Sequence, residues 1–261
     1  MKFNVRGAGP VILFLHGIPA NGRLWDRVVL FFEKKFTCVV VDLPALGESP
    51  PLADGSLDPT RYAEEIDALR EQLEIPRWHV VGHDAGATVA VHYAARFGRR
   101  VNKLVLCSAP VFPEFRVPWF FRLARTALIG DWLAMLVTGI LLPIALRREI
   151  GGCGDAKAEI IRSFRRPFTG FAGAKRFARL VCWGDPAQVL AKTAALLPAI
   201  GAPALILHGR TDGAIPMSFA TRAAAAIPCA SLHLLDCGHF VPLNAPEEFS
   251  ARVLSFFETP S

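Results

Sequence analysis

The chain has 261 residues, of which 52% are hydrophobic and 20% charged, and its formal net charge is +6. A chain of this length and composition can bury a large core, which excludes disorder as its main feature. The six cysteines are scattered without a close pair, so the sequence predicts neither a disulfide framework nor a zinc site. The segment Met1–Arg6 lacks the apolar core of a signal peptide. We therefore expect a globular cytoplasmic protein that uses no metal or other cofactor.

The positive charge is unevenly placed. Residues 112–192 hold 13 Lys/Arg and 6 Asp/Glu, a balance of +7, which leaves −1 for the rest of the chain. These basic residues follow no nucleic-acid reader motif, so a nucleic-acid partner is not expected. They could draw the chain weakly to an anionic membrane surface or attract an acidic substrate, although a solvated basic face is the simpler interpretation. The uncharged run 132–146 is shorter than the roughly 20 residues of a bilayer span, which argues against a stable membrane crossing.

Short β-branched runs alternate with segments of helical periodicity along most of the chain. This alternation predicts an α/β fold with a mostly parallel, doubly wound sheet. One helix is expected over residues 59–73, because Asp58 can cap its start and Pro59 suits its first turn. Another is expected from Pro246, with Asn244 as its cap. The expected strands are Val11–Leu15, Cys38–Asp42, His79–Gly82, Lys103–Cys107, Ala204–His208 and Leu232–Leu235.

The strand pattern is interrupted between Cys107 and Ala204 by a long helical segment that is rich in arginine and broken by prolines. We expect residues 112–192 of this segment to form an inserted helical lid. Such a lid would lie over the C-terminal ends of the strands, where ligands bind in open α/β sheets. Residues 1–111 and 193–261 would then form the core domain.

The most informative motif is Gly82–Gly86, with the sequence Gly-His-Asp-Ala-Gly, at the end of an expected strand. Small residues at these positions are typical of a nucleophile elbow, a sharp turn from strand to helix that presents its central side chain above the sheet. The central residue here is Asp84. A carboxylate nucleophile is already ionised at neutral pH, so it needs no base for its first attack.

Together with four other motifs in the same order along the chain, this elbow resembles the α/β-hydrolase superfamily. The motifs that carry the resemblance are His16-Gly17-Ile18-Pro19, Asp42-Leu43-Pro44-Ala45-Leu46-Gly47-Glu48-Ser49, Gly82–Gly86, His208-Gly209-Arg210-Thr211-Asp212 and Cys237-Gly238-His239-Phe240. They cover nearly the whole chain except the lid. The order of nucleophile, acid and histidine is also that of the superfamily.

Asp84, Asp212 and His239 each follow an expected strand of one parallel sheet, so they should emerge on the same edge and converge. His239 would then be the base, oriented by Asp212. The backbone amides of Ile18 and Ala85 are the expected oxyanion hole. Simpler interpretations remain open: Asp84 could cap a helix in an inactive fold, Asp212 could be a turn residue, and His239 could be structural.

Attack of Asp84 on a saturated carbon would give an alkyl ester, which water activated by His239 would hydrolyse. The motif Gly-x-Asp-x-Gly resembles the elbows of haloalkane dehalogenases, haloacetate dehalogenases and epoxide hydrolases. The sequence departs from all three, because Ala85 replaces the tryptophan or arginine usual after the nucleophile, and both tyrosines, Tyr62 and Tyr93, lie outside the lid. The lid tryptophans, whose N–H groups can hold a halide, are the alternative candidates: Trp119, Trp132 and Trp183.

We therefore expect dehalogenation of a small hydrophobic or carboxylate-bearing compound. Epoxide hydrolysis is one alternative, and a second is an esterase, lactone-cleaving or decarboxylating enzyme of the same fold. A third is a ligand-binding protein that keeps the fold without catalysis. The apolar runs of the lid favour a hydrophobic small-molecule substrate.

Overall fold

The computed structural model describes residues 1–118, 122, 130–152, 154–181 and 186–259. Its centre is a sheet of seven strands in the order β1-β3-β2-β4-β5-β6-β7. All neighbouring pairs are parallel except β1 with β3. The strands are β1 (Lys2–Arg6), β2 (Val11–Leu15), β3 (Thr37–Asp42), β4 (Trp78–His83), β5 (Val101–Cys107), β6 (Ala204–Gly209) and β7 (Ala230–Leu235). The predicted mostly parallel α/β sheet is therefore confirmed.

Strand β1 is the one strand that the sequence pattern does not predict. It pairs antiparallel with β3 from Lys2 opposite Asp42 to Arg6 opposite Cys38. All but one of its residues are exposed, because it forms the edge of the sheet. An edge strand with no buried face lacks the apolar alternation by which strands are recognised in sequence.

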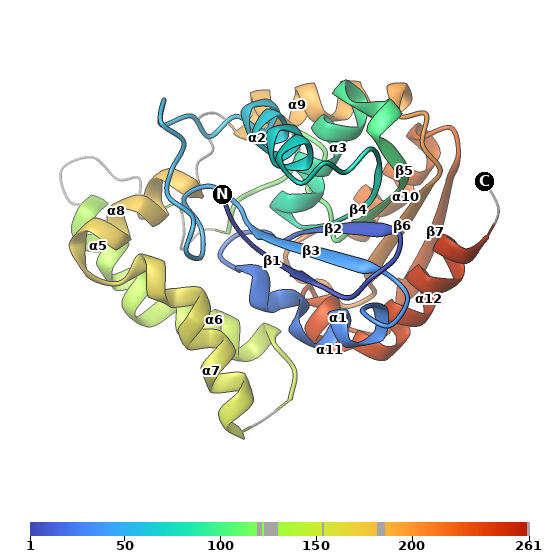
Figure 1. The fold of residues 1–261 in the computed structure, drawn as a ribbon. Helices are drawn as coiled ribbons and strands as arrows, with labels where there is room; N and C mark the ends of the chain where they lie inside the picture. The colour runs from blue at the N-terminus through green and yellow to red at the C-terminus, as the bar shows by residue number, and fades with distance from the viewer. Residues whose placement is uncertain (119–121, 123–129, 153, 182–185, 260–261) are drawn as a thin grey trace.

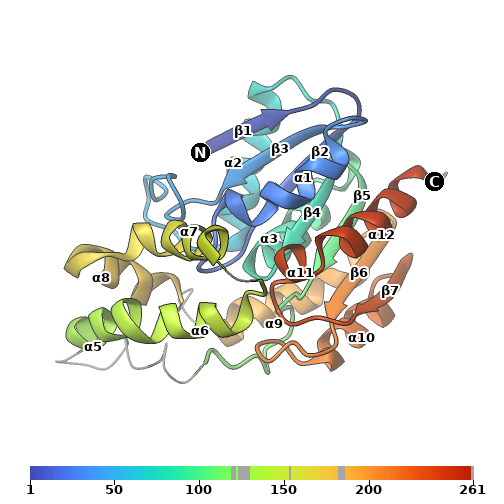
Figure 2. The same cartoon turned by 90° about the horizontal axis from the view of Figure 1, so that it is seen from below.

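Helices cover both faces of the sheet (Figure 1; Figure 2). Helices α1, α11 and α12 lie on one face, whereas α2, α3 and α9 lie on the other. The helices of this core are α1 (Asp26–Phe32), α2 (Pro59–Gln72), α3 (Ala85–Arg96), α9 (Pro186–Leu196), α10 (Met217–Ala226), α11 (Val241–Asn244) and α12 (Pro246–Glu258), with short 3-10 turns at Gly22–Trp25, Gly98–Arg100 and Leu197–Ala199.

The predicted ends of two core helices have different outcomes. Helix α2 begins as expected, since the Asp58 carboxylate accepts a hydrogen bond from the Thr60 amide and Pro59 occupies the first turn. Helix α12 also begins at Pro246, but the prediction that Asn244 caps it is wrong. The side chain of Asn244 instead forms hydrogen bonds with the backbone of Glu149 and Gly151. Because these tertiary contacts use both its oxygen and its nitrogen, the side chain does not cap the helix.

Between β5 and β6 the chain forms a helical layer to one side of the sheet (Figure 1). Its elements are α5 (Gly130–Leu136), a π-helical turn (Val137–Leu141), α6 (Leu142–Glu149), α7 (Gly154–Arg165), a 3-10 turn (Arg166–Phe168) and α8 (Gly170–Leu180). The next helix, α9, packs against α3 of the core. The expected lid boundary at residue 192 therefore falls inside a core-facing helix.

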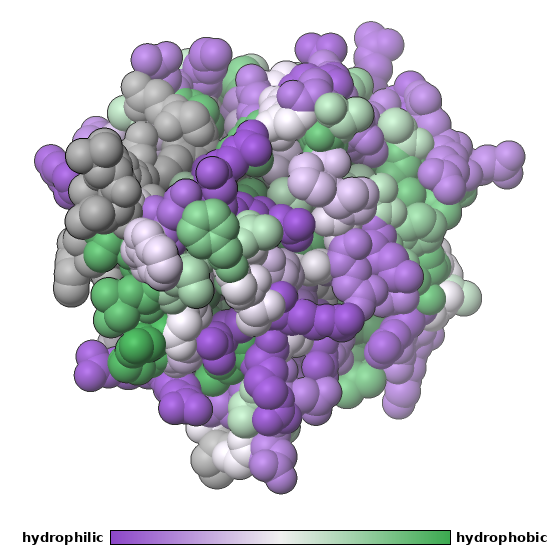
Figure 3. All heavy atoms as spheres, turned by 90° about the vertical axis from the view of Figure 1, so that its left-hand side faces the viewer, coloured by the Kyte–Doolittle hydropathy of each residue, from purple (hydrophilic) through white to green (hydrophobic). Residues whose placement is uncertain are grey.

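Among the described residues, Gly130–Glu149 is a helical run long and apolar enough to cross a bilayer by length and composition, and 39% of its apolar window is buried. Several of its apolar side chains are exposed at four-residue spacing, including Trp132, Leu136, Ile140 and Ile144. Figure 3 shows hydrophobic side chains among hydrophilic ones on this side of the molecule. That the chain does not span a membrane stays a prediction.

Candidate active site

Asp84 lies at the sharp turn between β4 and α3, with φ 50° and ψ −125°. A non-glycine residue in such a conformation costs about 1–3 kcal/mol, which the surrounding packing must offset. The two flanking glycines make the turn possible. A Cβ on Gly82 would lie 2.6 Å from the Cα of Ala87, and one on Gly86 would collide with the backbone of Leu15. The turn therefore has the tight geometry expected of a nucleophile elbow.

The carboxylate of Asp84 lies against the loop that follows β2. Its Oδ2 accepts a hydrogen bond from the Ile18 amide at 2.9 Å, and the Ala85 amide is a second backbone donor. Burial raises the pKa of Asp84 above its usual value, although the charge of His239 and both amides oppose that shift. The amides of Ile18 and Ala85 thus both bind the Asp84 carboxylate, and the same two amides are the expected oxyanion hole.

His239 and Asp212 form a second part of the site. The ring Nδ1 of His239 donates to Asp212 Oδ2 at 2.9 Å, so in the neutral ring Nε2 carries no hydrogen. The other oxygen of Asp212 accepts the amides of Ala214 and Ile215 at 2.8 and 2.9 Å. Burial alone would raise the pKa of Asp212, but its bond to His239 and these two amides hold that pKa well below the usual range.

The protonation of His239 depends on several neighbours. Burial by itself lowers its pKa, but the hydrogen bond and charge of Asp212, followed by the charges of Asp84 and Glu149, raise it above the ordinary 6.5. Beside it, burial lowers the pKa of His83 to about 3, so that ring is neutral. His83 Nε2 donates to the carbonyl oxygen of His239 at 2.9 Å and so fixes the backbone of the base.

The loop that supplies the Ile18 amide is held by His16. The Leu43 amide donates to Nε2 of His16 at 3.0 Å, and Nδ1 donates to the Gly17 carbonyl oxygen at 2.9 Å. Burial lowers the pKa of His16, which keeps the ring neutral as this pattern requires. His16 therefore positions the loop, a role that its motif alone does not reveal.

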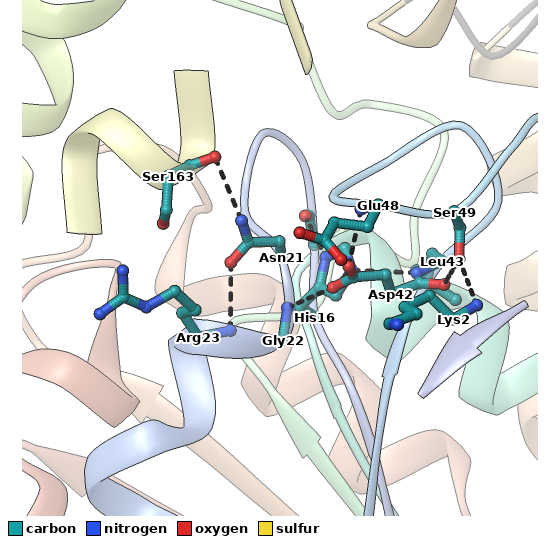
Figure 4. A network of polar contacts seen from close by, with 11 residues as sticks. Lys2, His16, Asn21, Gly22, Arg23, Asp42, Leu43, Glu48, Ser49 and Ser163 are labelled. Carbon is teal, nitrogen blue, oxygen red and sulfur yellow. Dashed lines mark hydrogen bonds and ion pairs between the residues drawn. The ribbon is translucent and has the colours of Figure 1, made fainter. Parts of the chain in front are cut away.

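A network around Asp42 completes this support (Figure 4). Its carboxylate accepts the amides of Gly22 and Glu48, each at 2.7 Å, and its carbonyl oxygen accepts the Ser49 hydroxyl at 2.6 Å. These bonds tie together the loops that follow β2 and β3. The second superfamily motif thus has a structural part in positioning the site.

Asp84, Ala85, Ile18 and His239 all line one cavity of about 270 Å³ between the sheet and the helical layer. Most of the other described lining residues are apolar, and Glu149 of α6 is the further charged residue among them. The apolar residues include Phe115, Val117, Leu142, Leu146, Leu180, Val181, Leu190, Ile215 and Phe240. Glu149 belongs to no motif, so only the folded chain reveals it. Among the described residues, no cluster of three or more His, Cys, Asp or Glu could hold a metal ion.

Of the three expected leaving-group residues, the structure describes only Trp132. Trp132 is 71% exposed and does not line it, so its position does not support contact with a leaving group. Trp119 and Trp183 lie outside the described residues. Both tyrosines are buried in the core, and their hydroxyls are hydrogen-bonded there. Tyr62 donates to the Pro44 carbonyl oxygen at 3.0 Å, and Tyr93 donates to Asp67 at 3.0 Å.

A family model for the alpha/beta hydrolase fold matches residues 10–246. The chain therefore belongs to the alpha/beta hydrolase fold family, and its class is hydrolase. An uncharacterized protein of Mycobacterium tuberculosis is 30% identical over 98% of this chain and 78% of its own length. A pimeloyl-[acyl-carrier protein] methyl ester esterase of Vibrio atlanticus is 26% identical over 98% of this chain and 97% of its own.

Two solved structures are similar throughout. A candidate epoxide hydrolase of Pseudomonas aeruginosa has a TM-score of 0.81 and 22% identity, covering 98% of this chain and 90% of the other. A candidate ancestral haloalkane dehalogenase has a TM-score of 0.81 and 23% identity, covering 98% and 94%. At this identity the likeness establishes the fold alone.

Proposed function

We propose that this hydrolase uses Asp84 as a covalent nucleophile and removes a halide from a small hydrophobic compound. The observation that carries the proposal is the placement of the Asp84 carboxylate. One oxygen accepts the Ile18 amide, and Asp84 lines the same apolar cavity as His239. A carboxylate at an elbow, with one oxygen held by amides, leaves its other oxygen for attack on a substrate.

In the first step, Oδ1 of Asp84 attacks the carbon that carries the halogen. The new C–O bond forms as the carbon–halogen bond breaks, and the halide leaves with the electron pair. No proton is transferred, because both the carboxylate and the halide are stable anions at neutral pH. The low polarity of the cavity strengthens the attack, since the carboxylate is poorly solvated there.

In the second step, Nε2 of His239 takes a proton from water, whose oxygen attacks Cγ of the Asp84 ester. The negative charge that develops on Oδ2 falls where the Ile18 amide already donates, and the Ala85 amide is the second donor to this carboxylate. When the tetrahedral intermediate collapses, the bond from Cγ to the alkyl oxygen breaks. The proton on His239 passes to that oxygen, and an alcohol is released. The Asp84 carboxyl group keeps the second proton of the water and loses it to solvent, which restores the carboxylate.

Halide removal is favoured over epoxide opening by the positions of the tyrosines. The oxygen of an opened epoxide needs a proton donor, whereas a halide does not. Tyr62 and Tyr93 are buried in the core with their hydroxyls bound elsewhere. No tyrosine is therefore left to act as that donor.

The covalent ester is the decisive test. A His239→Phe variant, which lacks the base, is incubated with pooled bromoalkanes, haloacids and epoxides, and its intact mass is measured. We expect a mass gain equal to the alkyl group, and none when Asp84→Asn is added. A single turnover of the wild type in heavy-oxygen water should place the label in Asp84 rather than in the alcohol. Absence of an adduct from every pool would contradict the proposal.

A second candidate is ester hydrolysis, which the Vibrio methyl ester esterase favours because it aligns with nearly the whole chain. In that reaction Asp84 would act as a base toward water instead of forming an alkyl ester. A p-nitrophenyl ester distinguishes the two. Turnover that needs Asp84, without an alkyl adduct in His239→Phe, would support the esterase.

A further inference from the structure

Glu149 is a carboxylate at the reaction centre that the proposed mechanism does not use. It is the last residue of α6 and lines the cavity together with Asp84 and His239. Its side-chain oxygens are the neighbours that a Cβ at Gly213 or Gly238 would meet, at 3.8 and 3.7 Å. Gly213 directly follows Asp212 in the chain, and Gly238 directly precedes His239. The charge of Glu149 therefore lies beside the base.

The backbone of Glu149 is held by hydrogen bonds from the core domain that do not involve its own side chain. Asn244 Nδ2 donates to the Glu149 carbonyl oxygen at 2.8 Å, and the Gly151 amide donates to Asn244 Oδ1 at 2.6 Å. Asn244 belongs to α11, which follows directly after His239 and Phe240. The end of α6 is thus attached to the same segment that carries the base.

No Lys or Arg in the described part of the chain neutralises this carboxylate. No described residue forms an ion pair or side-chain hydrogen bond with it, and no Lys or Arg is among the described lining residues. The preceding Arg147 and Arg148 are exposed and do not line the cavity. Glu149 is half-buried, and a carboxylate that faces an apolar cavity without such a partner is free to interact with the charge of a ligand.

We propose that Glu149 determines substrate specificity by excluding carboxylate-bearing compounds and admitting neutral or cationic ones. This inference rests on the proposed function for the reaction itself and narrows its substrate. A substrate carboxylate would meet Glu149 and Asp84 together, in a cavity of low polarity that strengthens their repulsion. The haloacids that the basic lid composition suggests would therefore be rejected by the cavity itself.

Binding of unreactive probes tests this independently of catalysis. Hexanoate, hexanamide and hexylammonium are straight chains of six carbons that differ in head-group charge. Their affinities are measured by titration calorimetry for the wild type, Glu149→Gln and Glu159→Gln, in alkaline buffer, which favours the neutral form of His239. Glu159 is a matched control, because it is a carboxylate of the same helical layer that pairs with Arg23 and does not line the cavity.

The wild type should bind hexanamide about tenfold more tightly than hexanoate or better, and Glu149→Gln should remove most of that ratio. Hexylammonium affinity should change in the opposite direction, and Glu159→Gln should leave all three unchanged. The inference is overturned if the wild type binds hexanoate as tightly as hexanamide, if Glu149→Gln leaves the ratio unchanged, or if none of the probes binds. A wild-type ratio near one overturns the inference even if the variant folds poorly. Failure of the Asp84 adduct experiment would instead remove the dehalogenation mechanism and leave these affinities standing.

Discussion

Replacement of Gly17 by alanine should disable the nucleophile without unfolding the protein. Gly17 packs directly against the side chain of Asp84. A Cβ added to Gly17 would lie 2.5 Å from the Cβ and 2.8 Å from the Cγ of Asp84. The backbone of Gly17 is not at positive φ, so an alanine there suffers no conformational strain. The clash with the carboxylate is therefore the main effect of the substitution.

The size of the effect follows from these distances. Two carbon atoms make ordinary contact at about 3.5 Å, so the side chain of Asp84 must retreat by about 1 Å. That movement breaks or stretches its 2.9 Å bond with the Ile18 amide. A misplacement of about 1 Å at a reacting group costs on the order of 100-fold in rate. Overpacking should lower stability by only about 1–3 kcal/mol.

The assay compares kcat and the melting temperature of Gly17→Ala with those of wild type and of Gly98→Ala. Gly98 is a suitable control, because no atom lies within 4 Å of its Cβ position. We expect kcat to fall about 100-fold in Gly17→Ala and to stay unchanged in Gly98→Ala. A folded Gly17→Ala that turns over at the wild-type rate would refute the idea that Asp84 must stay under the Ile18 amide.

Three further outcomes are expected. In Asp212→Asn, the Ala214 and Ile215 amides require the remaining oxygen, so the new NH₂ group faces His239 and stabilises its inactive tautomer. The kcat should fall about 10³–10⁴-fold with substrate affinity retained, and a much smaller loss would contradict the role of Asp212 in orienting His239. Asp212, Asp84 and Glu149 raise the pKa of His239, so activity should rise with pH through a midpoint above 6.5. Glu149→Gln should move that midpoint to lower pH in a pH–rate profile, and an unmoved midpoint would contradict the coupling of Glu149 to His239. Asp67→Ala removes the carboxylate that pairs with the buried guanidinium of Arg70 at 2.7 Å, and it should lower the free energy of unfolding by about 3 kcal/mol in urea denaturation. Asp54→Ala removes one partner of the exposed pair with Arg61 and should leave the urea midpoint unchanged.

The sequence predicts the parts of this fold whose signals are local. The buried strands appear as short apolar runs, and the cap of α2 is visible in Asp58 and Pro59. The Gly-x-Asp-x-Gly turn is recognisable because only small residues allow such close approach of two backbone segments. The contact between His239 and Asp212 follows from the rule that parallel strands end at one edge, and the structure contains it at 2.9 Å.

Other features depend on contacts between residues far apart in the chain. The exposed strand β1 is defined only by its pairing with β3, and Asn244 holds the end of α6 where a helix cap is expected from sequence. Likewise, Trp132 faces outward while Glu149 of the same helical run lines the cavity. Which residue of an apolar helix meets the active site depends on how that helix packs, and periodicity does not encode its rotation relative to a distant sheet. The sequence therefore determines the fold class and the candidate reacting residues. Tertiary packing decides which side chains surround them, because that packing is a property of the whole chain.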